Sequence, residues 1–144
     1  MAGNKEVPGG RLIMKTVMAQ GVFDLLHPGH LHYLNSSKEH GDKLVVVIAR
    51  DSRIDKDLHF TENERKEMIE ALEIVDKALL GSEESIYDTV KKVRPDVITL
   101  GYDQPFDEKD VESMAEEAIE EEVDVVRIGE KPDYSSTSIR ENTN

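Results

Sequence analysis

The chain has 144 residues, no cysteine and a formal net charge of −13, which suits one domain with a single core. The lack of cysteine excludes disulfides, thiolate metal sites and a cysteine nucleophile. The acidic charge argues against general nucleic-acid binding, which needs a basic face. The sequence has no run of eighteen or more apolar residues, so it does not indicate a membrane-spanning helix. We therefore expect a cytoplasmic protein without nucleic-acid or membrane partners.

Apolar, β-rich runs alternate with helical patterns along the whole chain. The predicted strands are 12–20, 44–49, 77–80, 97–100 and 123–128, and the predicted helices are 29–40, 62–75, 83–94 and 107–122. This alternation predicts an α/β fold, with a Rossmann-like doubly wound parallel five-stranded sheet in a single domain. Residues 1–13 are predicted to be a flexible lead or an expression remnant, and residues 14–144 the folded domain.

Two of the predicted helices carry clear local signals. Thr61 and Glu64 form a capping box, and Met68, Leu72 and Val75 then recur at helical spacing, which predicts a helix up to residue 75. The acidic run at 107–122, DEKDVESMAEEAIEEE, predicts a helix whose charged face is solvated.

The unusual residues all follow predicted strands. GVFDLLHPGH comes after the first strand, RDSRIDKD after the second, GYDQPFDE after the fourth and GEKPDYSSTS after the fifth. In open parallel sheets, ligands bind beyond the carboxyl ends of the strands, where the strand order reverses. The sequence therefore predicts a ligand site built from these segments.

The HPGH segment has the chemistry of an anion site. Pro28 suits the first turn of a helix, which places His27 at the cap and His30 one turn further on. Gly29 removes a side chain where something must approach the backbone. Free N–H groups at the helix start and two imidazole donors favour a phosphate chain as the ligand. A metal site would need a third protein ligand, for which the other histidines offer no motif. A plain surface or core role for the pair is the other alternative.

GVFDLLHPGH resembles the signature of the HxGH nucleotidyltransferase superfamily, and the resemblance extends from Met14 to Arg140. GDKLVVVIARD, ENERKEMIEALEIVDKALLG and SSTSIR resemble further segments of its cytidylyltransferase-like family. PDVITLGYDQPFDE resembles the archaeal FAD synthetase branch. The resemblance implies that an acceptor phosphate oxygen attacks the α-phosphorus of a nucleoside triphosphate and that pyrophosphate leaves. Positioning and charge stabilisation, with Mg²⁺ on the triphosphate, would carry the catalysis.

The resemblance assigns roles to individual residues. The implied catalytic residues are His27, His30, Lys56 and Arg65. The implied nucleotide-binding residues are Val22, Phe23, His27, Pro28, Gly29, His30, Gly101, Asp103, Tyr134, Ser135, Ser136 and Thr137. No side chain is assigned to a metal.

Several of these residues have plainer interpretations. Arg65 could be a surface helix cation, and Ser135, Ser136 and Thr137 could be ordinary helix caps. Asp24 could help to hold the loop, or it could have a plain turn or cap role. Relatives usually carry a longer, Lys-rich loop after the second strand. Here Lys56 would have to replace those lysines.

The expected reaction is transfer of AMP from ATP to FMN, which forms FAD and pyrophosphate. One alternative is a cytidylyltransferase that uses CTP and a phosphorylated polyol such as glycerol 3-phosphate. The depleted Lys loop leaves open a nucleotide-binding module with weak catalysis. A purely structural interaction protein would make the clustering at strand ends a coincidence. Because relatives are often homodimers, a homodimer is the partner that the resemblance suggests.

Overall fold

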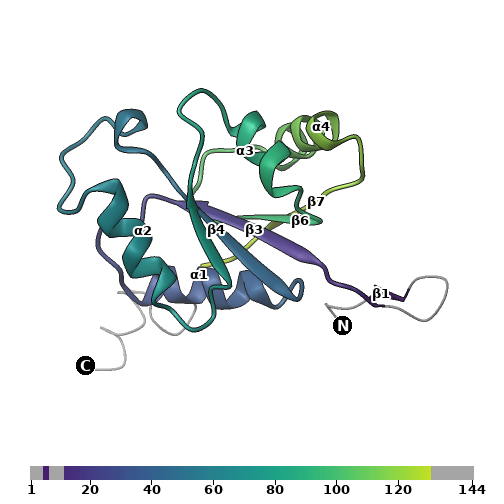
Figure 1. Cartoon of the computed structure of the whole chain (residues 1–144), viewed down its shortest axis with the longest axis horizontal. Helices are drawn as coiled ribbons and strands as arrows, with labels where there is room; N and C mark the ends of the chain where they lie inside the picture. The colour runs from purple at the N-terminus through teal and green to yellow at the C-terminus, as the bar shows by residue number, and fades with distance from the viewer. Residues whose placement is uncertain (1–4, 7–11, 131–144) are drawn as a thin grey trace.

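The computed structural model describes residues 5–6 and 12–130, and its centre is a five-stranded parallel sheet (Figure 1). The strands are β3 (Thr16–Gly21), β4 (Lys43–Ile48), β5 (Lys77–Leu80), β6 (Val97–Leu100) and β7 (Asp124–Arg127). Their order across the sheet is β5-β4-β3-β6-β7, with every neighbouring pair parallel. The predicted α/β fold with a five-stranded doubly wound sheet is confirmed.

Helices cover both faces of this sheet. α1 (Pro28–Lys38) and α2 (Glu62–Glu70) lie on one face, and α3 (Ile86–Val93) and α4 (Glu108–Ile119) on the other (Figure 1). The core therefore forms two layers, one around Leu34 and Ile69 and the other around Val90 and Ile119. Burial on both faces explains why the strands read as continuous apolar runs rather than alternating ones.

The strand order reverses beside β3. The chain passes from β3 to β4 and β5 on one side, then crosses to β6 and β7 on the other. The connections after β3 and β6 consequently leave their carboxyl ends in opposite directions. This separation opens the crevice in which ligands of such sheets are bound.

The first predicted strand, 12–20, is wrong in its extent because the chain leaves the sheet at its start. β2 (Leu12–Ile13) pairs antiparallel with β1 (Lys5–Glu6), outside the main sheet, and β3 begins only at Thr16. Between them the Met14 side chain is 58% exposed. The apolar run is therefore longer than the strand, since apolar residues can also lie on the protein surface.

The predicted helices also differ at their ends. α2 stops at Glu70 rather than 75, although Leu72 and Val75 still pack into the core from the turns that follow it. Helical spacing of apolar residues therefore continued beyond the helix itself. α4 stops at Ile119 because Glu120 adopts a left-handed conformation with φ 55°. Among the described residues, no helix is long and apolar enough to cross a membrane.

Candidate active site

The segment that joins β3 to α1 turns sharply at Phe23. This residue has φ 54° and is buried, although its side chain makes the left-handed region unfavourable. The Phe23 ring lies edge-on to the His30 ring, with centroids 5.5 Å apart. It also lies under Gly21, where a Cβ atom would come within 2.7 Å of the ring. The turn therefore brings β3, Phe23 and the start of α1 into one packed unit.

His27 and His30 cap the start of α1 with their own ring nitrogens. His27 Nδ1 accepts the Gly29 N–H at 3.1 Å, and His30 Nδ1 accepts the His27 N–H at 3.3 Å. Because Nδ1 is an acceptor in each ring, each neutral ring carries its proton on Nε2. The first-turn N–H groups are thus used internally, in contrast to the free groups expected from the sequence. What the helix start offers a ligand is a pair of Nε2–H donors.

The two rings lie close together, and this affects the charge of His30. Their centroids are 3.9 Å apart with a tilt of 31°. Burial lowers the pKa of His30 below its usual value, and the nearby His27 lowers it further, while Asp103 acts in the opposite direction. His30 is therefore a neutral hydrogen-bond donor near pH 7 in the free protein.

Gly29 makes room for this arrangement. A Cβ atom at position 29 would lie 2.8 Å from Cε1 and 3.0 Å from Nδ1 of the His27 ring. The sequence indicated that something approaches the backbone here, and the structure identifies it as the His27 ring. Any side chain at this position would push the cap away from the helix.

Arg65 is buried beneath the Val22–Phe23 peptide. Its side chain has no exposed surface, and its guanidinium donates to the Val22 carbonyl at 2.8 Å and to Asp51 Oδ1 at 2.6 Å. A trans peptide directs its C=O and N–H in opposite directions. Since the Val22 carbonyl faces Arg65, the Phe23 N–H is turned away from α2. The alternative of Arg65 as a surface cation is wrong, because its side chain is fully buried.

Asp24 ties the loop after β4 to the HPGH segment. Its carboxylate accepts the backbone N–H groups of His59 and Phe60 and lies 2.9 Å from His59 Nδ1. The His59 backbone N–H is the main cause that lowers the pKa of Asp24 to about 2. Asp24 is therefore ionised at physiological pH and holds the end of this loop beside the site.

A cavity of about 570 Å³ lies where β3, β6 and α1 meet, and we call it the first cavity. Its walls are the end of β3, the HPGH segment, the turn 101–104 and residues 128–130. Every predicted nucleotide-binding residue within 5–6 and 12–130 lines it. These residues are Val22, Phe23, His27, Pro28, Gly29, His30, Gly101 and Asp103. The structure thus brings together segments that lie up to 110 residues apart, from Gln20 to Glu130.

The floor of the first cavity is a network of buried polar groups. The Tyr33 hydroxyl donates to the Thr99 carbonyl at 2.8 Å and accepts the Gln20 N–H at 3.2 Å. Burial raises the pKa of Tyr33 to about 12, so the hydroxyl stays protonated. Gln104 completes the network, because its Nε2 donates to the Gln20 carbonyl at 3.1 Å. Buried hydrogen-bond networks of this kind hold a cavity wall in one geometry, although the buried Gln20 Oε1 has no hydrogen-bond partner in the described structure.

A second cavity of about 400 Å³ lies on the α3 and α4 side of the same strand ends. Its walls are mainly apolar and include Met18, Val47, Ile86, Leu100, Phe106, Val111 and Met114. Arg50 and Arg53 also line it. The two cavities share Gln20, Gly21, Val22 and Gln104, so they meet along the end of β3.

Known proteins resemble this chain over most of its length. A family model described as Cytidylyltransferase-like matches residues 18–142. The chain belongs to this family. A FAD synthase of Methanohalobium evestigatum is 45% identical over 128 residues, which covers 88% of this chain and 85% of that protein. A FAD synthase of Thermoplasma acidophilum is 54% identical over 101 residues, which covers 68% and 71%. The predicted membership in the cytidylyltransferase-like family is confirmed.

A solved structure supports the fold independently. The crystal structure of a Thermoplasma volcanium protein, named for lipopolysaccharide core biosynthesis, superposes with a TM-score of 0.78 at 50% identity. The match covers 82% of this chain and 98% of that one. The cytidylyltransferase-like chain described here therefore shares its architecture with a protein that carries a name different from the FAD synthases.

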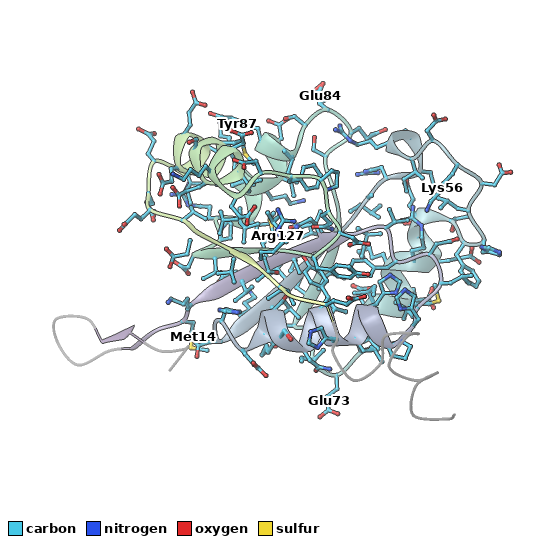
Figure 2. All side chains as sticks on the ribbon, turned by 180° about the vertical axis from the view of Figure 1, so that it is seen from behind. Met14, Lys56, Glu73, Glu84, Tyr87 and Arg127 are labelled. Carbon is cyan, nitrogen blue, oxygen red and sulfur yellow. The ribbon has the colours of Figure 1, made fainter. Side chains whose placement is uncertain are left out.

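The predicted catalytic residues do not all meet in this cytidylyltransferase-like site. His27 and His30 line the first cavity, whereas Arg65 lies buried behind Val22 and lines neither cavity. Lys56 lies exposed on the loop after β4, at the edge of the molecule in Figure 2. It lines neither cavity in the described structure. Tyr134, Ser135, Ser136 and Thr137 lie outside the described residues. The roles of these residues stay predictions.

Sequence reasoning missed residues whose partners are backbone groups. Arg127 on β7 donates to the Gly101 and Gln104 carbonyls, both at 2.8 Å, and so holds the turn after β6. A single arginine in VVRI gives no pattern that could have found it. Among residues 5–6 and 12–130, no group of three or more His, Asp or Glu could hold a metal ion.

Proposed function

We propose that this cytidylyltransferase-like protein transfers AMP from ATP to FMN, which yields FAD and pyrophosphate. The observation that carries the proposal is the pair of cavities that meet along Gln20, Gly21 and Val22. A transfer reaction needs two adjacent sites whose contents touch at one point. One cavity offers phosphate-binding donors, and the other offers apolar walls.

ATP occupies the first cavity in this proposal. The Nε2–H groups of His27 and His30 and the backbone N–H of Phe23 donate to its phosphate oxygens, where negative charge develops. Asp103 lies in the turn that borders the same cavity and contacts the nucleoside. A phosphate oxygen of FMN attacks the α-phosphorus, the bond to the β,γ-diphosphate breaks, and pyrophosphate leaves with that electron pair. No side chain becomes covalently bonded.

FMN occupies the second cavity. Apolar walls that include Ile86, Phe106 and Met114 suit a flat ring system, while Arg50 and Arg53 supply positive charge for a phosphate. Glycerol 3-phosphate has no apolar part to fill such walls. The second cavity thus favours the flavin over the polyol, which the sequence chemistry alone did not decide.

The remaining predicted residues support the reaction in this proposal. Arg65 acts through the Val22–Phe23 peptide, and Lys56 reaches the triphosphate from the loop that Asp24 holds. Tyr134 and the hydroxyls of Ser135, Ser136 and Thr137 contribute from beyond the described residues. Mg²⁺ arrives with the triphosphate in this proposal. A homodimer stays a prediction.

Pyrophosphate release across a grid of ATP or CTP with FMN or glycerol 3-phosphate tests the proposal. We expect turnover with ATP and FMN in the presence of Mg²⁺, with FAD identified by chromatography. CTP should be used less well. Turnover only with CTP and glycerol 3-phosphate would refute the flavin assignment and leave nucleotidyl transfer standing. Nucleotide binding without pyrophosphate release from any pair would refute the enzyme assignment itself.

A further inference from the structure

The turn between β6 and α4, residues 101–107, is the wall that separates the two cavities. Tyr102 and Asp103 line the first cavity, Pro105 and Phe106 line the second, and Gln104 lines both. A change in the shape of this turn must therefore alter both cavities at once.

One guanidinium holds most of this turn. Arg127 Nη1 donates to the carbonyls of Gly101 and Gln104, both at 2.8 Å, and Nη2 donates to the Phe106 carbonyl. Nη2 also lies 2.6 Å from Glu108 Oε1. Arg127 is the last residue of β7 and pairs in register with Leu100, directly before the turn. The backbone of the turn is thus wrapped around a single side chain near the centre of Figure 2.

Apart from Arg127, one backbone hydrogen bond and the Gln104 side chain fix the shape of the turn. The Gln104 N–H donates to the Gly101 carbonyl at 3.2 Å, and this is the one backbone hydrogen bond within 101–106 that we find in the described structure. The Gln104 Oε1 accepts the Gly101 N–H at 3.0 Å, and its Nε2 donates to the Gln20 carbonyl at 3.1 Å, which ties the turn to β3. A planar guanidinium can serve three carbonyls at fixed angles, whereas a lysine ammonium is a single flexible point charge. Lysine at position 127 would keep the charge and lose the geometry.

We propose that Arg127 is a positioning residue that shapes the common wall of the two cavities, so that both substrate affinities depend on this one side chain. The inference rests on the proposed function for the identity of the two substrates. Arg127 itself lines neither cavity in the described structure and acts through the turn.

The test compares steady-state constants for Arg127→Lys with those for two controls. Arg94→Lys is the matched control, because Arg94 also donates to a backbone carbonyl, that of Ile119, and pairs with Glu121 away from both cavities. Glu108→Gln removes only the ion pair and leaves the carbonyl contacts of Arg127. The assay is FAD formation, with the KM of ATP and of FMN measured separately.

We expect Arg127→Lys to raise both KM values by about 10-fold and to lower kcat by at least as much, since misplacement of the reactants slows transfer strongly. Both controls should stay within about 2-fold of the unmodified protein. Asp103→Asn should raise chiefly the KM of ATP, and Phe106→Ala chiefly that of FMN. A rise in both KM values for Arg127→Lys would show that Arg127 shapes a wall shared by the two cavities, whereas a residue that contacts one substrate would raise only one KM.

A rise in only one KM for Arg127→Lys, or an effect equal to that of Arg94→Lys, would overturn the inference. If Arg127→Lys does not fold, Glu108→Lys provides a second test, because the new cation at this half-exposed position repels the guanidinium from the turn. It should cause a smaller rise in both KM values together, and unchanged KM values would again overturn the inference. Failure of the unmodified protein to make FAD would instead count against the proposed function.

Discussion

Replacement of Arg65 by methionine should cost about 3 kcal/mol of folding free energy. The guanidinium donates to three groups, the Val22 carbonyl, the Phe60 carbonyl and Asp51. Hydrogen bonds with a charged partner each contribute about 1.5–3 kcal/mol, and removal of one member of a buried pair costs about 3–5 kcal/mol. Asp51 is 45% exposed and can be hydrated again, which places the expected value at the lower end.

Urea unfolding followed by circular dichroism measures this change. With a slope of about 2 kcal/mol per molar urea, a loss of about 3 kcal/mol lowers the midpoint by about 1.5 M. Arg53→Met is the control, because Arg53 is exposed and donates to one carbonyl, that of Glu83, at 3.2 Å. Its expected cost is below about 0.5 kcal/mol.

The same variant tests how Arg65 acts in the reaction. Without the guanidinium the Val22 carbonyl is released, and the Phe23 N–H loses its direction. We expect kcat to fall by about 10²-fold even at saturating ATP, as for the loss of one preorganised donor. If Arg65→Met lost no more stability than Arg53→Met, or kept its kcat, the peptide-orienting role would be refuted.

Four further variants test the site. His27→Ala and His30→Ala should each lower kcat by roughly 10²-fold while the fold survives, and near-normal turnover would remove the ring from the mechanism. Asp24→Asn should remove an acid-sensitive contribution to stability. The folded pKa of about 2 lies below the ordinary aspartate value of 3.8, so this contribution is present above the unfolded value and lost as the pH falls toward 2. If Asp24→Asn and the unmodified protein unfolded at the same acid pH, this role of Asp24 would be contradicted. Lys56→Ala should slow transfer more than Lys92→Ala on α3, and equal rates would refute a contact between Lys56 and the triphosphate.

The parts of the fold that the sequence predicted are those set by local rules. Apolar runs marked all five strands of the sheet, and the capping box at Thr61 marked the start of α2, because burial and capping leave signals in neighbouring residues. The ends were less predictable. Val75 continues the helical spacing of α2 although it packs from a turn, since the core selects apolar residues whatever the backbone does.

The site shows the same division. HPGH was readable because its residue types and spacing have a chemical meaning in sequence. Arg65 was expected among the residues that contact the reacting groups, but it is buried behind Val22. A sequence shows that a residue is charged, but it does not show what surrounds that charge in the fold. Arg127 had no signal, since its partners are main-chain carbonyls that every residue possesses.

If ATP binds beside His27 and His30 as we propose, the close pair of rings makes nucleotide binding a proton-binding event. In the free protein, burial and the neighbouring His27 keep the pKa of His30 below its usual value. Phosphate charge beside the rings stabilises the imidazolium form and so raises that pKa. Between the free and bound values, each ATP that binds carries a fraction of a proton into the complex, and its affinity increases as the pH falls. In calorimetry, the heat of binding should then vary with the ionisation heat of the buffer, and His30→Ala should abolish most of that variation.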